Sequence, residues 1–114
     1  MIAVIFEVVP REGQRDAYLE AAARLRPILE KIDGFVSIER FQSLGNPGKM
    51  LSLSYWRDEE AVKAWRNQEG HRLTQERGRN EIFADYSLNV AQVLRSYGMN
   101  ERAEAPADSR ALHG

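Results

Sequence analysis

Hydrophobic and polar positions along the chain follow two periods, one typical of strands and the other of helices. Residues 2–9 are mostly β-branched or aromatic, and they predict a strand that ends at Pro10, which cannot donate to a neighbouring strand. After Gly13 the apolar positions recur at steps of three and four residues, which predicts an amphipathic helix carrying Tyr18, Ala22, Leu25, Leu29 and Ile32. We expect Pro27 to kink or divide this helix.

Two further strands and a turn follow the first predicted helix. Asp33-Gly34 predicts the end of that helix, and residues 35–42 and 49–56 have strand patterns. The turn-forming run Gly45-Asn46-Pro47-Gly48 separates the two strands, so they are expected to form a hairpin.

The last third of the domain predicts a second helix and a fourth strand. Asp58 is a suitable N-cap, and acidic residues follow it where the helix dipole favours them. The helix is expected to run to about residue 82, with a break at Gly70 as an alternative, and residues 86–94 predict the last strand. The order β-α-β-β-α-β indicates an α+β, ferredoxin-like fold, with one four-stranded antiparallel sheet and both helices on one face.

The strands are apolar on both faces. In the first strand the apolar residues on one face are Ile2, Val4, Phe6 and Val8, and those on the other are Ala3, Ile5 and Val9. The third strand sets Leu51, Leu53 and Tyr55 against Met50 and Trp56, and the second sets Val36 and Ile38 against Phe35 and Phe41. Since two helices cover only one face, we expect a homodimer in which the sheets meet face to face. The alternative is a monomer whose partly wet sheet face is marked by Ser37, Ser52, Ser54 and Asn89.

Composition narrows the functional classes. The 114 residues suit one domain over residues 1–99, and 43% hydrophobic with 29% charged residues is typical of a globular chain. The net charge of −1 gives no general reason to bind nucleic acid or an anionic membrane. The absence of cysteine excludes disulfides and cysteine-ligated metal centres. The apolar start is too short for a signal peptide or a membrane span, so a cytoplasmic location is expected.

Residues 100–114 form a polar C-terminal tail. Their apolar surface is too small to offset the entropy lost on ordering, so the tail is expected to be mobile when alone. The alternative is that it lies over a neighbouring subunit.

The most distinctive candidate chemistry lies in the polar run after Trp65. His71, Gln75 and Arg79 are spaced by four residues, so on one helix they would share a single face. That face is either solvated or the wall of a polar pocket. The sequence contains no cluster of His, Asp or Glu at a metal-ligand spacing, no glycine-rich phosphate loop after a strand and no aromatic-basic RNA-binding motif.

Several short motifs resemble the antibiotic biosynthesis monooxygenase domain family. They are Gly34-Phe35, Glu39-Arg40-Phe41, residues 51–58, Trp65-Arg66-Asn67, His71 with Gln75, Gly78-Arg79 and Phe83-Ala84-Asp85-Tyr86. The resemblance covers residues 1–99 and implies the dimeric α+β barrel superfamily, whose enzymes include cofactor-free oxygenases of polycyclic aromatic substrates and haem-degrading monooxygenases. It also implies a pocket between the helices and the sheet of each subunit.

The resemblance gives roles to five residues. His71 is a candidate base or hydrogen-bond donor, since its ordinary pKa near 6.5 suits proton transfer at neutral pH. Trp65 would supply a flat wall and an indole donor, and Gln75, Arg79 and Asn67 are candidates to hold the substrate. For His71, Gln75 and Arg79 the alternative is an exposed structural face, and for Trp65 it is core packing.

We therefore expect a cofactor-free monooxygenase acting on an aromatic or quinol-type small molecule. Haem is a weaker alternative, because haem-degrading relatives resemble one another in a strand-one asparagine and a histidine ten residues after the tryptophan. In this chain the first strand has Phe6 and Glu7 in place of the asparagine, and the tenth position after Trp65 is Gln75 in place of the histidine. A second alternative is a dimeric small-molecule binding or stress-response module without turnover.

Overall fold

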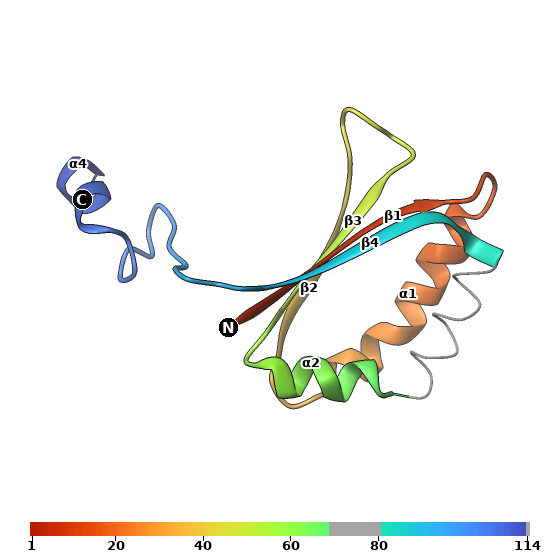
Figure 1. Ribbon diagram of the computed structural model, residues 1–114, viewed down its shortest axis with the longest axis horizontal. Coiled ribbons are helices and arrows are strands. Elements are labelled where there is room, and N and C mark those ends of the chain that lie inside the picture. The colour runs from red at the N-terminus through yellow and green to blue at the C-terminus, as the bar shows by residue number, and fades with distance from the viewer. Residues whose placement is uncertain (69–80, 114) are drawn as a thin grey trace.

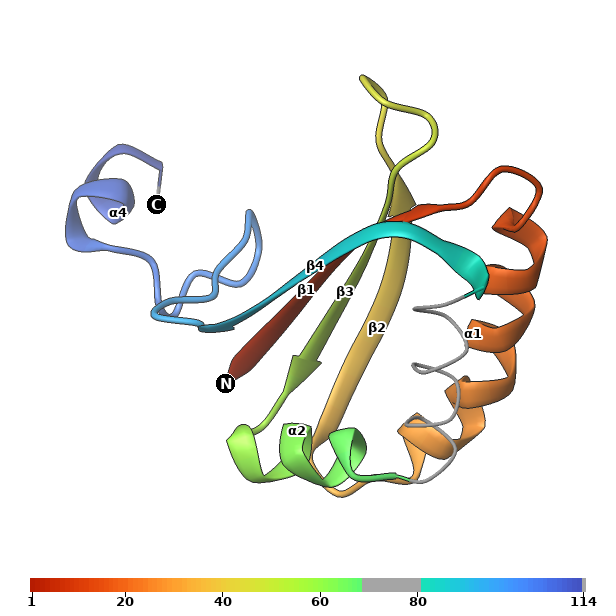
Figure 2. The same ribbon diagram turned by 45° about the vertical axis from the view of Figure 1, so that its right-hand side comes forward.

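The computed structural model describes residues 1–68 and 81–113, and it has the predicted element order. The elements are β1 (Ile2–Pro10), α1 (Arg15–Glu30), β2 (Phe35–Gln42), β3 (Met50–Trp56), α2 (Glu59–Arg66), β4 (Phe83–Gln92) and α4 (Ala107–His113). The four strands form one antiparallel sheet in the order β2-β3-β1-β4, and α1 and α2 lie on the same side of it (Figures 1 and 2). The ferredoxin-like fold is therefore confirmed.

The sheet has an inner face toward the two helices and an open face on the other side. Residues directly opposite one another in the register share a face, and the inner face includes the row Ile38, Ser54, Val4 and Val90. The side chains of β3 alternate between buried and half-buried, with Met50, Ser52, Ser54 and Trp56 on the inner side. The alternation fixes which residues can line a cavity under the helices.

Two separate hydrophobic clusters hold the helices on the inner face. One contains Ile2, Val4, Leu29, Ile38, Trp56, Ala61 and Val62, and the other contains Val8, Tyr18 and Met50. Between them the inner face carries the polar side chains of Ser52 and Ser54, with Arg40 opposite Ser52 on β2. The core is thus divided at the middle of the sheet, where the strands place polar residues.

The predicted faces of β2 were wrong at its start. A β-bulge lies between Phe35 and Ser37, which pair with Trp56 and Tyr55 respectively. The extra residue reverses the alternation, so Phe35 shares the inner face with Ile38 and packs edge-on against Trp56 at 5.3 Å between ring centroids. Val36, which was grouped with Ile38, is instead 54% exposed.

The four residues that marked a partly wet sheet face in the monomer alternative do not share one face. Ser52 and Ser54 are buried on the inner face. Ser37 pairs with Tyr55 and Asn89 pairs with Ile5, which places both on the open face.

Three element boundaries differ from the predictions. α1 continues through Pro27 as one helix, so the proline does not divide it. α2 ends at Arg66, before Gly70, with the Asn67 backbone N–H donating to the Lys63 carbonyl at 3.0 Å. β4 begins at Phe83 because its pairing with β1 extends to Pro10.

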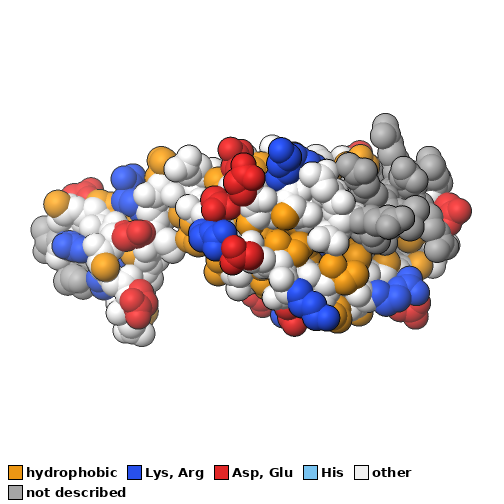
Figure 3. All heavy atoms as spheres, turned by 90° about the horizontal axis from the view of Figure 1, so that it is seen from below, with side chains coloured by type: hydrophobic (Ala, Val, Ile, Leu, Met, Phe, Trp, Pro, Cys, Tyr) orange, Lys and Arg blue, Asp and Glu red, His pale blue; other side chains and the backbone are white. Residues whose placement is uncertain are grey.

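The segment after β4 contains a short helix that the sequence analysis did not expect. The backbone N–H of Ser96 donates to the Glu104 carboxylate at 2.8 Å, and the Arg102 guanidinium lies over the Tyr97 ring. The segment and α4 lie apart from the sheet, and from below they form a separate lobe (Figures 1 and 3). Over the described residues, no helix is long and apolar enough to cross a membrane.

Candidate functional site

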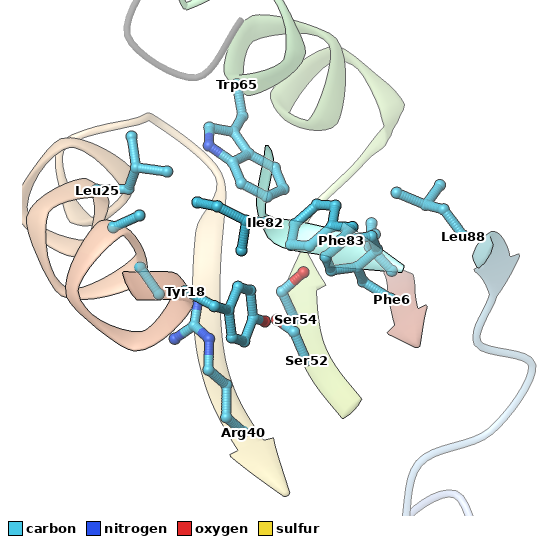
Figure 4. A pocket seen from close by; sticks show the side chains of 13 residues that line it. Phe6, Tyr18, Leu25, Arg40, Ser52, Ser54, Trp65, Ile82, Phe83 and Leu88 are labelled. Atoms are coloured by element: carbon cyan, nitrogen blue, oxygen red, sulfur yellow. The ribbon is translucent and has the colours of Figure 1, made fainter. Parts of the chain in front are cut away.

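A cavity of about 90 Å³ lies between the inner face of the sheet, α1, the end of α2 and the start of β4 (Figure 4). It occupies the gap between the two hydrophobic clusters. The residues that line it come from all four strands, from α1 and α2, and from the position just before β4: Val4, Phe6, Tyr18, Ala21, Ala22, Leu25, Arg40, Ser52, Ser54, Trp65, Ile82, Phe83 and Leu88. Most of these side chains are apolar, so the cavity suits a largely apolar ligand.

One wall of the cavity is an aromatic cluster. The ring of Phe83 meets those of Phe6 and Tyr18 edge-on, each at 5.8 Å between centroids, and Tyr86 lies 5.7 Å from Phe6. Such edge-to-face contacts fix ring orientations more tightly than aliphatic packing does. The contact with Phe83 therefore helps to orient the Tyr18 ring.

Trp65 forms part of another wall and also belongs to the core. Its ring stacks on Trp56 at 5.3 Å between centroids with an interplanar angle of 18°. Trp56 is fully buried, and its indole N–H donates to the Ser54 hydroxyl at 3.0 Å. Trp65 therefore packs against the core, as one alternative predicted, and it also lines the cavity. Its contact with a substrate stays a prediction.

The position of Trp65 depends on how α2 is attached. The Asp58 carboxylate accepts the backbone N–H of Ala61 at 3.0 Å, as an N-cap does. Arg57 donates to both carboxylate oxygens of Asp33 at 3.1 Å and to Asp58, and its backbone N–H donates to the Gly34 carbonyl at 2.7 Å. These bonds fix the start of α2 beside the start of β2.

The same contacts shift three pKa values. The Arg57 hydrogen bond lowers the pKa of Asp33 below its ordinary value. The pKa of Asp58 is lowered mainly by the hydrogen bond from the Ala61 backbone and then by Arg57. The hydrogen bonds to Asp33 and Asp58 raise the pKa of Arg57. All three side chains are on the surface, and none of them is among the residues that line the cavity.

The polar part of the cavity consists of Arg40, Tyr18, Ser52 and Ser54. The Tyr18 hydroxyl and the Arg40 Nε are buried, and within the described part of the chain neither has a hydrogen-bond partner. No acidic side chain is among the described residues that line the cavity. The polar end therefore offers hydrogen-bond donors and one positive charge.

The predicted site residues are only partly described. Trp65 lines the cavity. Asn67 is the exposed C-cap of α2 and is not among the residues that line the cavity. His71, Gln75 and Arg79 lie outside the described residues. The arrangement of these three on one helix face therefore stays a prediction.

Sequence reasoning missed the polar end of the cavity. Tyr18 was assigned to the core of the first helix, and Ser52 and Ser54 were considered only as markers of a wet sheet face in the monomer alternative. Arg40 carried a usable signal, because strand alternation places it on the inner side with Ile38, where a charged residue is unusual. No group of three or more His, Cys, Asp or Glu capable of holding a metal ion is found in residues 1–68 and 81–113.

The fold agrees with comparisons to known proteins. The family model described as antibiotic biosynthesis monooxygenase matches residues 1–77, which is more than half of the chain. The chain therefore belongs to the antibiotic biosynthesis monooxygenase family. It is 48% identical over 101 residues to the jasmonate monooxygenase ABM of Pyricularia oryzae, a match that covers 89% of this chain and 47% of that protein.

Two other matches extend the comparison. The protein YqjZ of Bacillus subtilis is 31% identical over 93 residues, covering 82% of this chain and 79% of that protein. The structure of Rv0793 from Mycobacterium tuberculosis has a TM-score of 0.76 at 18% identity, covering 85% of this chain and 98% of that one. The chain spans about half the length of the jasmonate monooxygenase, and the match to Rv0793 supports the fold alone.

Proposed function

We propose that this protein is a cofactor-independent monooxygenase that oxidises an aromatic or quinol-type small molecule in the cavity under α1 and α2. The observation that carries this proposal is the aromatic-walled cavity in a member of the antibiotic biosynthesis monooxygenase family. Phe6, Phe83 and Trp65 offer ring surfaces against which a flat substrate can lie.

The proposed chemistry uses the substrate as the source of electrons. A base removes a proton from a CH2 group flanked by aromatic rings, which produces a carbanion that reacts with O2. The group ends as a carbonyl and the second oxygen atom leaves as water, so the substrate supplies all four electrons needed to reduce O2. A cavity that excludes water favours this route, because it limits reprotonation of the carbanion.

The base and the residues that hold the substrate remain proposals. His71 is proposed as the base, with Gln75 and Arg79 holding the substrate oxygen atoms. Trp65 is proposed to contact the reacting ring, which its place in the cavity wall supports. Jasmonate is tested beside these substrates, because a relative 48% identical to this chain is named jasmonate monooxygenase. It has no CH2 group between aromatic rings, so the step described above does not apply to it.

We also propose that the working unit is a homodimer joined through the open faces of the sheets. Ile5, Leu53 and Tyr55 lie on that face and are only half-buried in the single chain. One end of the face is polar, since Glu7 pairs with Lys49 at 3.4 Å and accepts a hydrogen bond from Ser87. This division suggests an apolar interface bounded by a polar rim.

Oxygen consumption tests the proposed activity. Metal-free protein is mixed with anthrone-type and hydroquinone-type substrates and with jasmonate, with and without added haem. We expect uptake without haem, lowered about 100-fold by His71→Ala, since general-base catalysis typically contributes a factor of this size. His113→Ala is the matched control, because it removes the other histidine of the chain.

Two results would redirect the proposal. Uptake that requires haem would indicate the haem-dependent class instead. Saturable ligand binding without uptake on any substrate would indicate a binding or stress-response module that uses the same cavity without turnover.

A further inference from the structure

We infer that Arg40 and Tyr18 form a carboxylate-binding subsite, so that the ligand of this cavity is an apolar molecule with one carboxylate at its end. This inference deepens the proposed function, since it names the substrate class for the same cavity. Both residues line that cavity, one from β2 and the other from α1 (Figure 4).

The buried Nε of Arg40 is the first observation. Arg40 lies on the inner face opposite Ser52 and is half-buried as a residue, and its Nε is buried without a hydrogen-bond partner among the described residues. A buried N–H group without an acceptor is costly, and a carboxylate oxygen is the acceptor that a guanidinium binds most strongly. Strand alternation directs Glu39 toward the open face, so the neighbouring carboxylate does not face the cavity.

Tyr18 is the second, independent observation. Its side chain is only 6% exposed, and its hydroxyl has no hydrogen-bond partner in the described part of the chain. Such a group costs about 1–3 kcal/mol relative to a satisfied one, so natural proteins retain few of them without a use. The hydroxyl sits on a ring in contact with Phe83 and lines the same cavity as Arg40.

The remaining walls define the rest of the ligand. Leu25, Ile82, Phe83 and Leu88 surround the cavity with apolar surface, and the described lining residues include one cation and no acid. A carboxylate carries the single negative charge that balances the Arg40 guanidinium. It also has two oxygen atoms, so it can accept hydrogen bonds from more than one donor of the cavity.

The first experiment measures binding and needs no variant. Phenylacetate and its neutral isostere phenylacetamide are titrated into the whole protein by isothermal titration calorimetry under nitrogen. We expect phenylacetate to bind at least about tenfold more tightly, because hydrogen bonds to charged groups are the stronger ones.

Variants then assign the preference to the two residues. Arg40→Gln should weaken phenylacetate binding about 10- to 100-fold and leave phenylacetamide within about twofold. Tyr18→Phe should weaken phenylacetate binding by a smaller factor. The affinity of Arg40→Lys for phenylacetate should lie between those of the wild type and Arg40→Gln. Arg24→Gln removes a charge from the exposed side of α1 and is the matched control, expected to change neither ligand.

Clear outcomes would overturn the inference. They are equal affinity for the acid and the amide, equal loss of both in Arg40→Gln, or no binding of phenylacetate at millimolar concentration. Preferential binding of 4-ethylphenol that rises toward its pKa near 10 would instead indicate a phenolate. The proposed oxygenase is tested separately. A preference for the carboxylate without oxygen uptake supports this subsite and contradicts the oxygenase. Oxygen uptake that is unchanged in Arg40→Gln supports the oxygenase and contradicts this subsite.

Discussion

Tyr18 combines two roles that usually oppose one another. Its ring belongs to the core cluster with Val8 and Met50, whereas its hydroxyl lies at the cavity without a described partner. Removal of an unsatisfied buried hydroxyl is expected to be neutral or favourable for folding, since the hydroxyl loses its hydrogen bonds to water when the protein folds.

The prediction at the residue scale is that Tyr18→Phe unfolds at the same temperature as the wild type or at a higher one. The free energy of unfolding should rise by up to about 1 kcal/mol, because the ring contacts remain and only the hydroxyl is lost. Thermal and urea unfolding measure this. A fall of more than about 1 kcal/mol would mean that the hydroxyl supports the fold rather than a ligand.

At the scale of elements, the corner between α1 and β2 determines where α2 lies. Gly34 has φ +93°, and a Cβ added there would lie 2.7 Å from the Ala61 Cβ at the start of α2. A side chain at this position would therefore push α2 away from the sheet, and Trp65 with it.

Gly34→Ala should destabilise the protein by at least about 2 kcal/mol, from strain in the left-handed region together with the overlap. Gly13→Ala is the matched control, because Gly13 has φ +79° and nothing within 4 Å of an added Cβ. It should cost only the backbone strain, about 1 kcal/mol. Chemical denaturation of both variants gives the difference; equal losses would show that the contact with Ala61 has no effect.

The N-cap of α2 makes stability depend on pH. The folded-state pKa of Asp58 is lowered, so its contribution is present above the unfolded pKa of about 3.9 and is lost as pH falls through the lower folded value. Asp58→Asn keeps an oxygen acceptor and removes the charge. The variant should be less stable than the wild type at pH 7, and the difference should shrink below about pH 4. Thermal unfolding across this range is the measurement, and a difference independent of pH would contradict it.

At the scale of the whole molecule, the open sheet face and the C-terminal lobe are the surfaces that the single chain leaves uncovered. The lobe includes Leu94 and Met99, 81% and 89% exposed, next to a short helix that lies apart from the sheet (Figures 1 and 2). From below, acidic and basic side chains are interspersed over the main body, in agreement with a net charge near zero (Figure 3).

If the open face is the dimer interface, Leu53→Arg should raise the dimer dissociation constant by at least about 100-fold, because an unpaired charge would be buried there. Leu44→Arg is the matched control, since Leu44 lies in the turn between β2 and β3 and is 99% exposed. Analytical ultracentrifugation measures both variants. A wild-type protein that is monomeric at micromolar concentration would contradict the proposed dimer directly.

The order of elements follows from local patterns. Two patterns were sufficient to predict a strand and a helix: the alternation in residues 50–56 and the helical spacing of Tyr18, Ala22 and Leu29. Each pattern follows the repeat of the backbone itself. The extent of α2 and the start of β4 were not predicted, since they depend on capping at Asn67 and on pairing with Pro10.

The sequence by itself determined the strands, the helices, their order and the family to which the chain belongs. The tertiary structure decided which side chains meet. The bulge beside Val36 reversed one strand's faces, and the sheet brought Arg40 of β2 and Tyr18 of α1, 22 residues apart in the chain, to one cavity. Periodicity describes only neighbours along one element, whereas a binding site depends on register between strands and on how helices pack across them.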